Sequence, residues 1–174
     1  MSGRTLVAGV GNIFLGDDGF GPEVARRLAG SALPDGVRVA DYGTSGMHLA
    51  YDLAGYQTAI LVDAAPRGEA PGTVTVLDVE PGHRPAPAAD GLAGSRLFDG
   101  HGMQPDLVFG VLDMLGGTAS RILVVCCEPA STDYRIGLSE PVAGAVGEAV
   151  RIVRDLLGTA AGEPPAAVAG AGEE

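Results

Sequence analysis

Runs of apolar residues alternate along the chain with segments in which apolar residues recur every three or four positions. The runs predict strands, at Thr5–Val10, Val37–Tyr42, Thr58–Val62, Thr73–Leu77 and Ile122–Cys127. The helical spacing predicts helices, at Gly21–Leu28, Met47–Leu53, Pro105–Leu115 and Pro141–Leu157. Strands that alternate with helices are typical of an α/β fold. We therefore expect a three-layer domain, with a mainly parallel, five-stranded twisted sheet and helices on both faces.

The pattern stops shortly after the last predicted helix. Residues 159–174 contain one larger apolar residue, Val168, so burial cannot offset the entropy lost on ordering this tail. Residues 80–100 are rich in Pro, Ala and Gly, and we expect them to form a long surface loop. The sequence thus predicts a single α/β domain over residues 1–158 and a disordered tail over residues 159–174.

Charge and composition exclude several classes of function. The formal net charge is −11, whereas nucleic-acid binding needs clustered basic residues. All eleven basic residues are Arg, and the absence of Lys removes Schiff-base chemistry and the Lys of a P-loop. No apolar stretch approaches the roughly 20 residues of a membrane span, and no secretory signal is visible. We expect a cytoplasmic protein with no membrane and no nucleic-acid partner.

The turn after the first predicted strand, "GVGNIFLGDDGFG" (9–21), partly resembles a dinucleotide-binding loop. Gly9 and Gly11 fit the first two glycines of that fingerprint, but Phe14 stands at the third. Asp17 and Asp18 would place negative charge where a phosphate should bind. The sequence disfavours a nucleotide-binding oxidoreductase. It leaves two roles for the aspartates: one can cap the following helix, and the other can point into a cleft and bind a cation.

Acidic side chains also follow other predicted strands, and ligands of open α/β sheets usually bind beyond the carboxyl ends of the strands. Asp41 ends the second strand and Asp63 the third, while His101 directly precedes a predicted helix. Asp18, Asp63 and His101 would together offer two carboxylates and an imidazole, a donor set that suits a borderline divalent metal with open positions. The alternatives are a turn-forming Asp63 and a helix-capping His101, and the spacing alone does not decide between them.

The segment around the last strand looks structural. Cys126 and Cys127 are adjacent, so in a strand their side chains point to opposite faces, and we interpret them as small core residues. Ser139 precedes the last helix and is a candidate N-cap. We expect the connection "EPASTDYRIGLS" (128–139) to act mostly as scaffold.

Five stretches, in this order, resemble the endopeptidases that mature nickel–iron hydrogenases. They are "GVGNIFLGDDGFGPEVARRL" (9–28), "DYGTSGMHL" (41–49), "AILVDAAPRG" (59–68), "GHGMQPDLVFGVL" (100–112) and "CEPASTDYRIGLSEPVAGAV" (127–146). The resemblance implies helices around a five-stranded, mainly parallel sheet. It implies an aspartic-type protease that removes the C-terminal extension of a hydrogenase large-subunit precursor after nickel insertion. By the family pattern, Asp18, Asp63 and His101 would contact the metal, and Asp41 would lie near the same cleft, so these four are the candidate catalytic residues.

Nickel would then reach the site with the substrate precursor, and no organic cofactor is expected. Carboxylate and imidazole donors bind nickel only moderately, so we expect a weak half-site that recognises a precursor already carrying the metal. A water held by the metal or by a carboxylate would attack the peptide carbonyl. The alternative is a non-catalytic, nickel-dependent assembly factor that binds the same precursor without cutting it.

Overall fold

The computed structural model describes residues 3–79, 119 and 121–159. In this part of the chain five strands form one sheet in the order β2-β1-β3-β5-β4. Their bounds are Thr5–Val10 for β1, Val37–Gly43 for β2, Thr58–Ala64 for β3, Val74–Val79 for β4 and Arg121–Cys127 for β5. The first four strands of this order are mutually parallel, and β4 pairs with β5 in the antiparallel direction at one edge. The expected five-stranded, mainly parallel sheet is confirmed.

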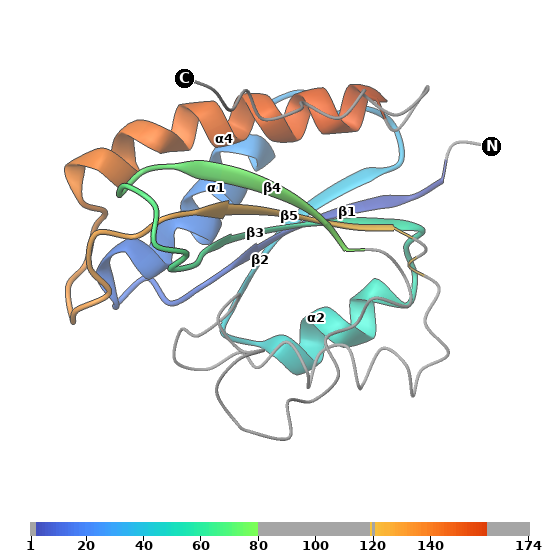
Figure 1. Ribbon diagram of the computed structural model, residues 1–174. Coiled ribbons are helices and arrows are strands. Elements are labelled where there is room, and N and C mark those ends of the chain that lie inside the picture. Colours follow the sequence, from blue (N-terminus) through green and yellow to red (C-terminus); the bar gives the residue numbers. More distant parts are fainter. Residues whose placement is uncertain (1–2, 80–118, 120, 160–174) are drawn as a thin grey trace.

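Helices cover both faces of the sheet. Helix α1 (Phe20–Ala29) and helix α4 (Glu140–Thr159) pack on one face, while α2 (Gly46–Leu53) lies on the other (Figure 1). A 3₁₀ turn, η1 (Gly16–Gly19), joins β1 to α1. The described strands and helices match the predicted ones to within a few residues. The predicted helix Pro105–Leu115, the loop 80–100 and nearly all of the predicted tail lie outside the described residues, so these expectations stay predictions.

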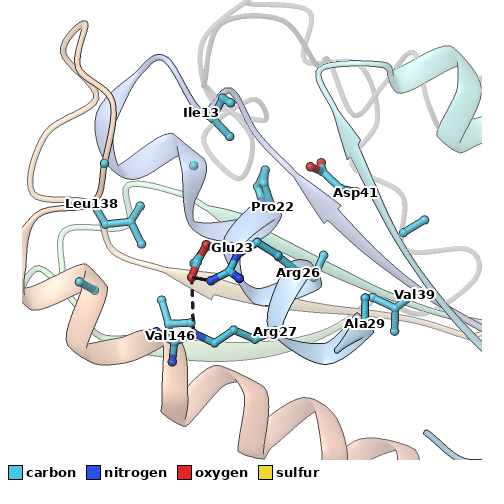
Figure 2. A pocket seen from close by; sticks show the side chains of 15 residues that line it. Ile13, Pro22, Glu23, Arg26, Arg27, Ala29, Val39, Asp41, Leu138 and Val146 are labelled. Carbon is cyan, nitrogen blue, oxygen red and sulfur yellow. Dashed lines mark hydrogen bonds and ion pairs between the residues drawn. The ribbon is translucent and has the colours of Figure 1, made fainter. Parts of the chain in front are cut away.

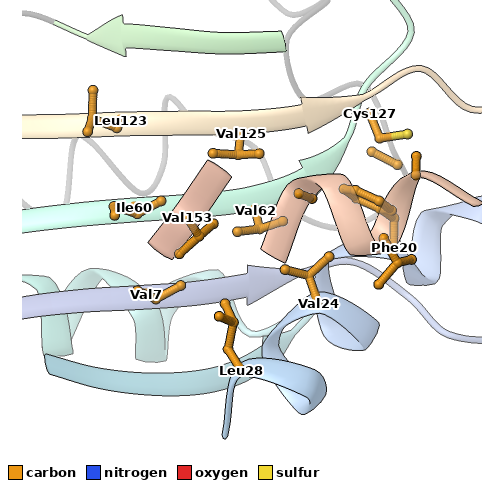
Figure 3. Packing of buried hydrophobic residues seen from close by; sticks show 14 of the residues in the cluster. Val7, Phe20, Val24, Leu28, Ile60, Val62, Leu123, Val125, Cys127 and Val153 are labelled. Carbon is orange, nitrogen blue, oxygen red and sulfur yellow. The ribbon is translucent and has the colours of Figure 1, made fainter. Parts of the chain in front are cut away.

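Each face of the sheet has its own hydrophobic core. Residues that alternate along β1, β3 and β5 point in turn toward α1 and α4 or toward α2. The core on the α1–α4 side contains Phe20, Val24 and Leu28 of α1 packed on the strands (Figure 3). Cys126 belongs to the α2-side core and Cys127 to the other, as their adjacency in a strand predicts. Both thiols are free and buried, and burial is the main cause that raises the pKa of Cys127 to about 12. Cys127 is therefore a packing residue.

Glycines in the first turn allow α1 to lie directly on the strands. A Cβ on Gly21 would collide with the carbonyl oxygens of Val10 and Val62, and a Cβ on Gly9 would collide with the backbone of Gly21. Gly11 has φ 138°, a conformation that favours glycine, and a Cβ there would collide with the carbonyl oxygen of Asp18. These glycines serve close backbone packing around η1, which fixes the position of the two aspartates.

Candidate active site

The carboxyl edge of the sheet gathers acidic side chains at the ends of two neighbouring strands. Asp17 and Asp18 lie in η1, just after β1, and Asp63 lies near the end of β3, the strand that pairs with β1. All three are almost completely buried, with exposed fractions of 0, 4 and 6%. Buried carboxylates are costly unless they are hydrogen-bonded or bound to a cation. Their different hydrogen-bond partners therefore indicate different roles.

Asp17 is fully supplied with hydrogen-bond donors. Its Oδ1 accepts the N–H of Ser139 at 2.6 Å, and its Oδ2 accepts the Ser139 hydroxyl at 2.8 Å and the N–H groups of Ala130 and Ser131 at 2.8 and 3.1 Å. Burial alone would raise the pKa of Asp17, but these hydrogen bonds together lower it below its usual value. Asp17 is thus a stable anion that fastens the connection between β5 and α4 onto η1.

This arrangement corrects the expectation that an aspartate caps α1. The N-cap residue of α1 is Gly19, and no side chain caps that helix end, so neither aspartate has the predicted capping role. Ser139 does precede α4, and its carbonyl oxygen accepts the N–H of Ala143, but its hydroxyl donates to Asp17. The donors come from a connection more than 110 residues away in the sequence, which local patterns do not reveal. The expectation that residues 128–139 act as scaffold agrees with these contacts.

Asp18 and Asp63 form a second, differently supplied group. The N–H of Asn12 donates to Oδ2 of Asp18 at 2.7 Å, and the N–H of Ala64 donates to Oδ1 of Asp63 at 2.8 Å. Desolvation raises the pKa of Asp63 well above its usual value, and the negative charge of Asp18 raises it further, while the bond from Ala64 offsets only part of this. The charge of Asp63 is therefore costly in its surroundings, and a proton or a cation bound there would offset that cost.

Asp41 lies at the end of β2 with a different orientation. Tyr42, its neighbour in the strand, belongs to the α2-side core, so Asp41 points to the α1 side. Its Oδ1 accepts the N–H of Gly43 at 2.8 Å. Asp41, Ile13 and Pro22 line a hollow of about 700 Å³ along the outer side of α1 (Figure 2), and neither Asp18 nor Asp63 lines it. The predicted catalytic role of Asp41 stays a prediction.

His101, the third predicted metal contact, lies outside the described residues, so its place relative to the aspartates stays a prediction. Within the described part of the chain, no three His, Cys, Asp or Glu side chains gather as a metal-binding group. Asp18 and Asp63 are thus the two predicted ligands that this part brings together.

Sequence reasoning missed a second set of contacts at this edge, between the ends of β3 and β5. Glu128, directly after β5, accepts the N–H of Arg67 with Oε2 at 2.6 Å. The N–H of Ala65 donates to the carbonyl of Cys127 at 3.0 Å, and the N–H of Gly72 donates to that of Glu128 at 2.8 Å. These bonds hold the loop that carries Arg67 beside Asp63. The sequence signal for Glu128 was an acidic residue directly after a buried strand. No sequence signal marked its partner, Arg67.

A mainly parallel α/β sheet that buries two interacting carboxyl groups beyond its strand ends is typical of an α/β enzyme with an acidic site. Comparison with known proteins shows the family. A model of the HycI hydrogenase maturation protease family matches residues 22–156. The hydrogenase expression/formation protein HupD of Rhodobacter capsulatus is 35% identical over 158 residues, which cover 87% of this chain and 71% of that protein.

Two relatives from Escherichia coli agree with this match. The hydrogenase 2 maturation protease of strain K12 is 32% identical over 152 residues, which cover 86% of this chain and 88% of that protein. The solved structure of the hydrogenase maturating endopeptidase HybD superimposes with a TM-score of 0.71 at 31% identity, covering 88% of this chain and 91% of that one. The chain belongs to the hydrogenase maturation protease family and is a hydrolase of the endopeptidase type. Among the described helices, none is long and apolar enough to cross a membrane.

Proposed function

We propose that this endopeptidase removes the C-terminal extension of a nickel–iron hydrogenase large-subunit precursor after nickel has been inserted. The observation that carries the proposal is the buried pair Asp18 and Asp63. Burial and the charge of Asp18 raise the pKa of Asp63, so the charge of Asp63 is poorly stabilised without a cation. A divalent ion between the carboxylates would replace their repulsion by attraction. The pair thus suits a substrate that brings its own cation.

Nickel recognition then follows from competition between donors. Thiolates of the precursor would bind nickel more tightly than carboxylates do, so the ion stays with the substrate and the protease supplies additional contacts from Asp18, Asp63 and His101. A precursor without nickel would leave the raised pKa of Asp63 unopposed by a cation and would find no anchor for the segment to be cut. In this proposal the electrostatics of the site allow the precursor to be cut only after nickel has been inserted into it.

The same pair supports an aspartic type of hydrolysis. Burial and the charge of Asp18 raise the pKa of Asp63, so this carboxyl group takes up a proton more readily than an exposed one. Once nickel occupies the pair, a carboxylate is available to accept a proton from the attacking water. In this proposal Asp41, at the end of the neighbouring strand β2, is a further catalytic residue.

An apolar rim beside the site supports a protein as substrate. Two loops far apart in the sequence pair here: the N–H of Arg135 donates to the carbonyl of Phe14 at 2.9 Å, and the N–H of Gly16 donates to that of Arg135 at 2.8 Å. The rim exposes four large apolar side chains, namely Ile13, Phe14, Tyr134 and Ile136. Exposed apolar groups that gather in one place are typical of surfaces that bind another protein. The rim lies next to η1, so a bound precursor would reach the carboxylates.

A precursor assay tests the proposal directly. The purified protein is incubated with a large-subunit precursor that either carries nickel or lacks it, and the intact mass of the precursor is measured over time. We expect the mass of the extension to be lost only from the nickel-loaded form. A nickel-loaded precursor that binds and is never shortened would instead support the non-catalytic assembly factor. Equal cleavage of both forms would contradict the nickel requirement.

A further inference from the structure

Strand β2 lies at one edge of the sheet, and part of its backbone points away from the sheet. Among the described strands, only β1 pairs with β2. The N–H of Thr5 donates to the carbonyl oxygen of Gly36 at 3.0 Å, and this bond sets the alternation of the parallel ladder. By this alternation Ala40 bonds to β1, while both backbone groups of Val39 and the N–H of Asp41 face the outer edge. Within the described residues these outward groups have no hydrogen-bond partner.

The outer edge of β2 has few of the features that prevent a sheet from pairing with another chain. Exposed edges are commonly protected by Lys or Pro in the edge strand, and the sequence of β2, "VRVADYG", contains neither. Val39 is half-buried and packs against the core on the α1 side. The edge therefore offers free backbone groups beside apolar surface, which is the combination that binds an extended peptide as an added strand.

The hollow of about 700 Å³ along α1 lies directly beside this edge, because Val39 and Asp41 line it (Figure 2). On the side of β2 its lining is mostly apolar, with Ile13, Pro22 and Ala29. An added strand would direct every second side chain to the α1 side of the sheet, and so into the hollow. Ile13 also belongs to the apolar rim, so the rim and the hollow form one continuous surface.

The same edge leads to the two interacting carboxyl groups. Gly9 of β1 is paired with Asp41 on one side and with Val62 on the other. Asp63 directly follows Val62, so Asp41 and the end of β3 lie two strand spacings apart, about 10 Å. An extended chain crosses this distance in about three residues. A peptide with its bond to be cut at the carboxyl groups could therefore continue along β2.

We propose that the free edge of β2 and the hollow beside it bind the C-terminal extension of the precursor as an added, antiparallel strand. The direction follows from the order of the segments, since the bond to be cut lies at the carboxyl edge and the extension continues from it toward the beginning of β2. Backbone pairing would hold the extension, and the hollow would take an apolar side chain at every second position. An edge pairs with a segment whose own backbone groups are free, and the discarded extension meets this condition better than the folded body of the precursor. This proposal rests on the proposed function, since it assigns a binding surface to that substrate.

The test compares Val39→Pro with the wild-type protein in cleavage of the nickel-loaded precursor. The N–H of Val39 is not used in the sheet, so proline removes a donor from the edge and obstructs it without breaking a bond to β1. We expect kcat/KM to fall by about 30-fold, mainly through KM, as for the loss of about two hydrogen bonds in binding. Val39→Lys keeps the backbone groups and places a charge in the hollow, and we expect a loss of about 10-fold. If Val39→Pro does not fold, Val39→Lys carries the same comparison.

Val76→Pro is the matched control at the opposite edge of the sheet. The N–H of Glu128 donates to the carbonyl of Thr73 at 2.9 Å, so by the alternation of the antiparallel ladder Val76 also directs its backbone groups outward. The exposed fraction of Val76 is 39%. Val76→Pro should cleave the precursor at the wild-type rate.

A nickel-loaded precursor whose extension is shortened to two residues separates binding at the edge from distortion of the site. Two residues do not reach Asp41, so we expect the wild type and Val39→Pro to cut this precursor with the same, reduced kcat/KM. The inference is wrong if Val39→Pro loses as much rate on the short precursor as on the full one, or if it cuts the full one within about threefold of the wild type. In both cases the proposed function stands. A wild-type protein that never shortens the full precursor would overturn the proposed function, and the inference with it.

Discussion

Two buried carboxyl groups at the same edge of the sheet have opposite surroundings. Asp17 accepts four hydrogen bonds from the connection between β5 and α4, and they lower its pKa despite burial. Within the described part of the chain, Asp63 accepts one bond, from its neighbour Ala64, and burial together with the charge of Asp18 raises its pKa. The fold thus stabilises the charge of Asp17 and leaves that of Asp63 unstabilised.

The difference separates a structural carboxylate from a chemical one. A carboxylate that the protein satisfies by itself has nothing left to offer a ligand, whereas one held at a cost in free energy gains from a cation or a proton. Carboxyl groups whose environments push their pKa values apart are a recurring feature of acid–base sites. Here Asp17 is of the first kind and Asp63 is of the second.

The largest expected effect comes from changing Asp63. Asp63→Asn removes a charge that the substrate needs and that the fold does not, so we expect cleavage of the nickel-loaded precursor to fall by at least about 1,000-fold. The melting temperature should stay unchanged or rise, because the buried charge is costly. Intact-mass kinetics and thermal unfolding measure the two effects. Asp78→Asn is the control, because Asp78 of β4 has an exposed side chain that pairs with Arg121. It should change neither the cleavage rate nor the melting temperature. Near-wild-type cleavage by Asp63→Asn would end the assignment of this site.

Changing Asp17 should give the reverse result. Asp17→Ala leaves the N–H groups of Ala130, Ser131 and Ser139 without their acceptor, and we expect a loss of about 3–5 kcal/mol in the free energy of unfolding. Urea unfolding measures this loss. Asp155→Ala is the control, because its exposed pair with Arg151 should contribute less than about 1 kcal/mol. A stability of Asp17→Ala equal to that of the wild type would show that the four bonds are not the structural anchor we describe.

The smallest expected effect is a difference in pH dependence. The pKa of Asp17 is lower in the folded state than in the unfolded state, so its contribution is complete above about pH 4 and is lost as the pH falls further. The pKa of Asp63 is higher in the folded state, so the wild type loses stability as the pH rises from about 4 toward that folded value. Each slope reaches at most about 1.4 kcal/mol per pH unit.

Urea unfolding between pH 3 and pH 8, with divalent metals removed, separates the two groups. The stability gap between the wild type and Asp17→Ala should shrink toward low pH. The free energy of unfolding of Asp63→Asn should increase relative to that of the wild type as the pH rises above about 4. Below about pH 4 this difference should vanish. Parallel curves for Asp63→Asn and the wild type would contradict the raised pKa of Asp63.

The alternation of apolar runs and helical stripes determined the α/β class, because a strand buried on both faces requires helices on both sides. The position of Asp63 at a strand end was enough to place it at the ligand-binding edge, since parallel strands end together. Five ordered motifs indicated the family, which the comparisons with known proteins confirm. Each single signal behind these inferences, a strand, a helical stripe or a motif, lies within a short segment of the chain.

Only the tertiary structure decided which of the two neighbouring aspartates is structural. The donors to Asp17 are backbone N–H groups and one hydroxyl from residues 113 to 122 positions away, and backbone groups have no signature in the sequence. The same holds for the loop of Arg67, which is held by Glu128 from 61 positions away. The residue type determines the chemical group of a side chain, but its pKa and its role depend on which distant groups the fold brings into contact with it.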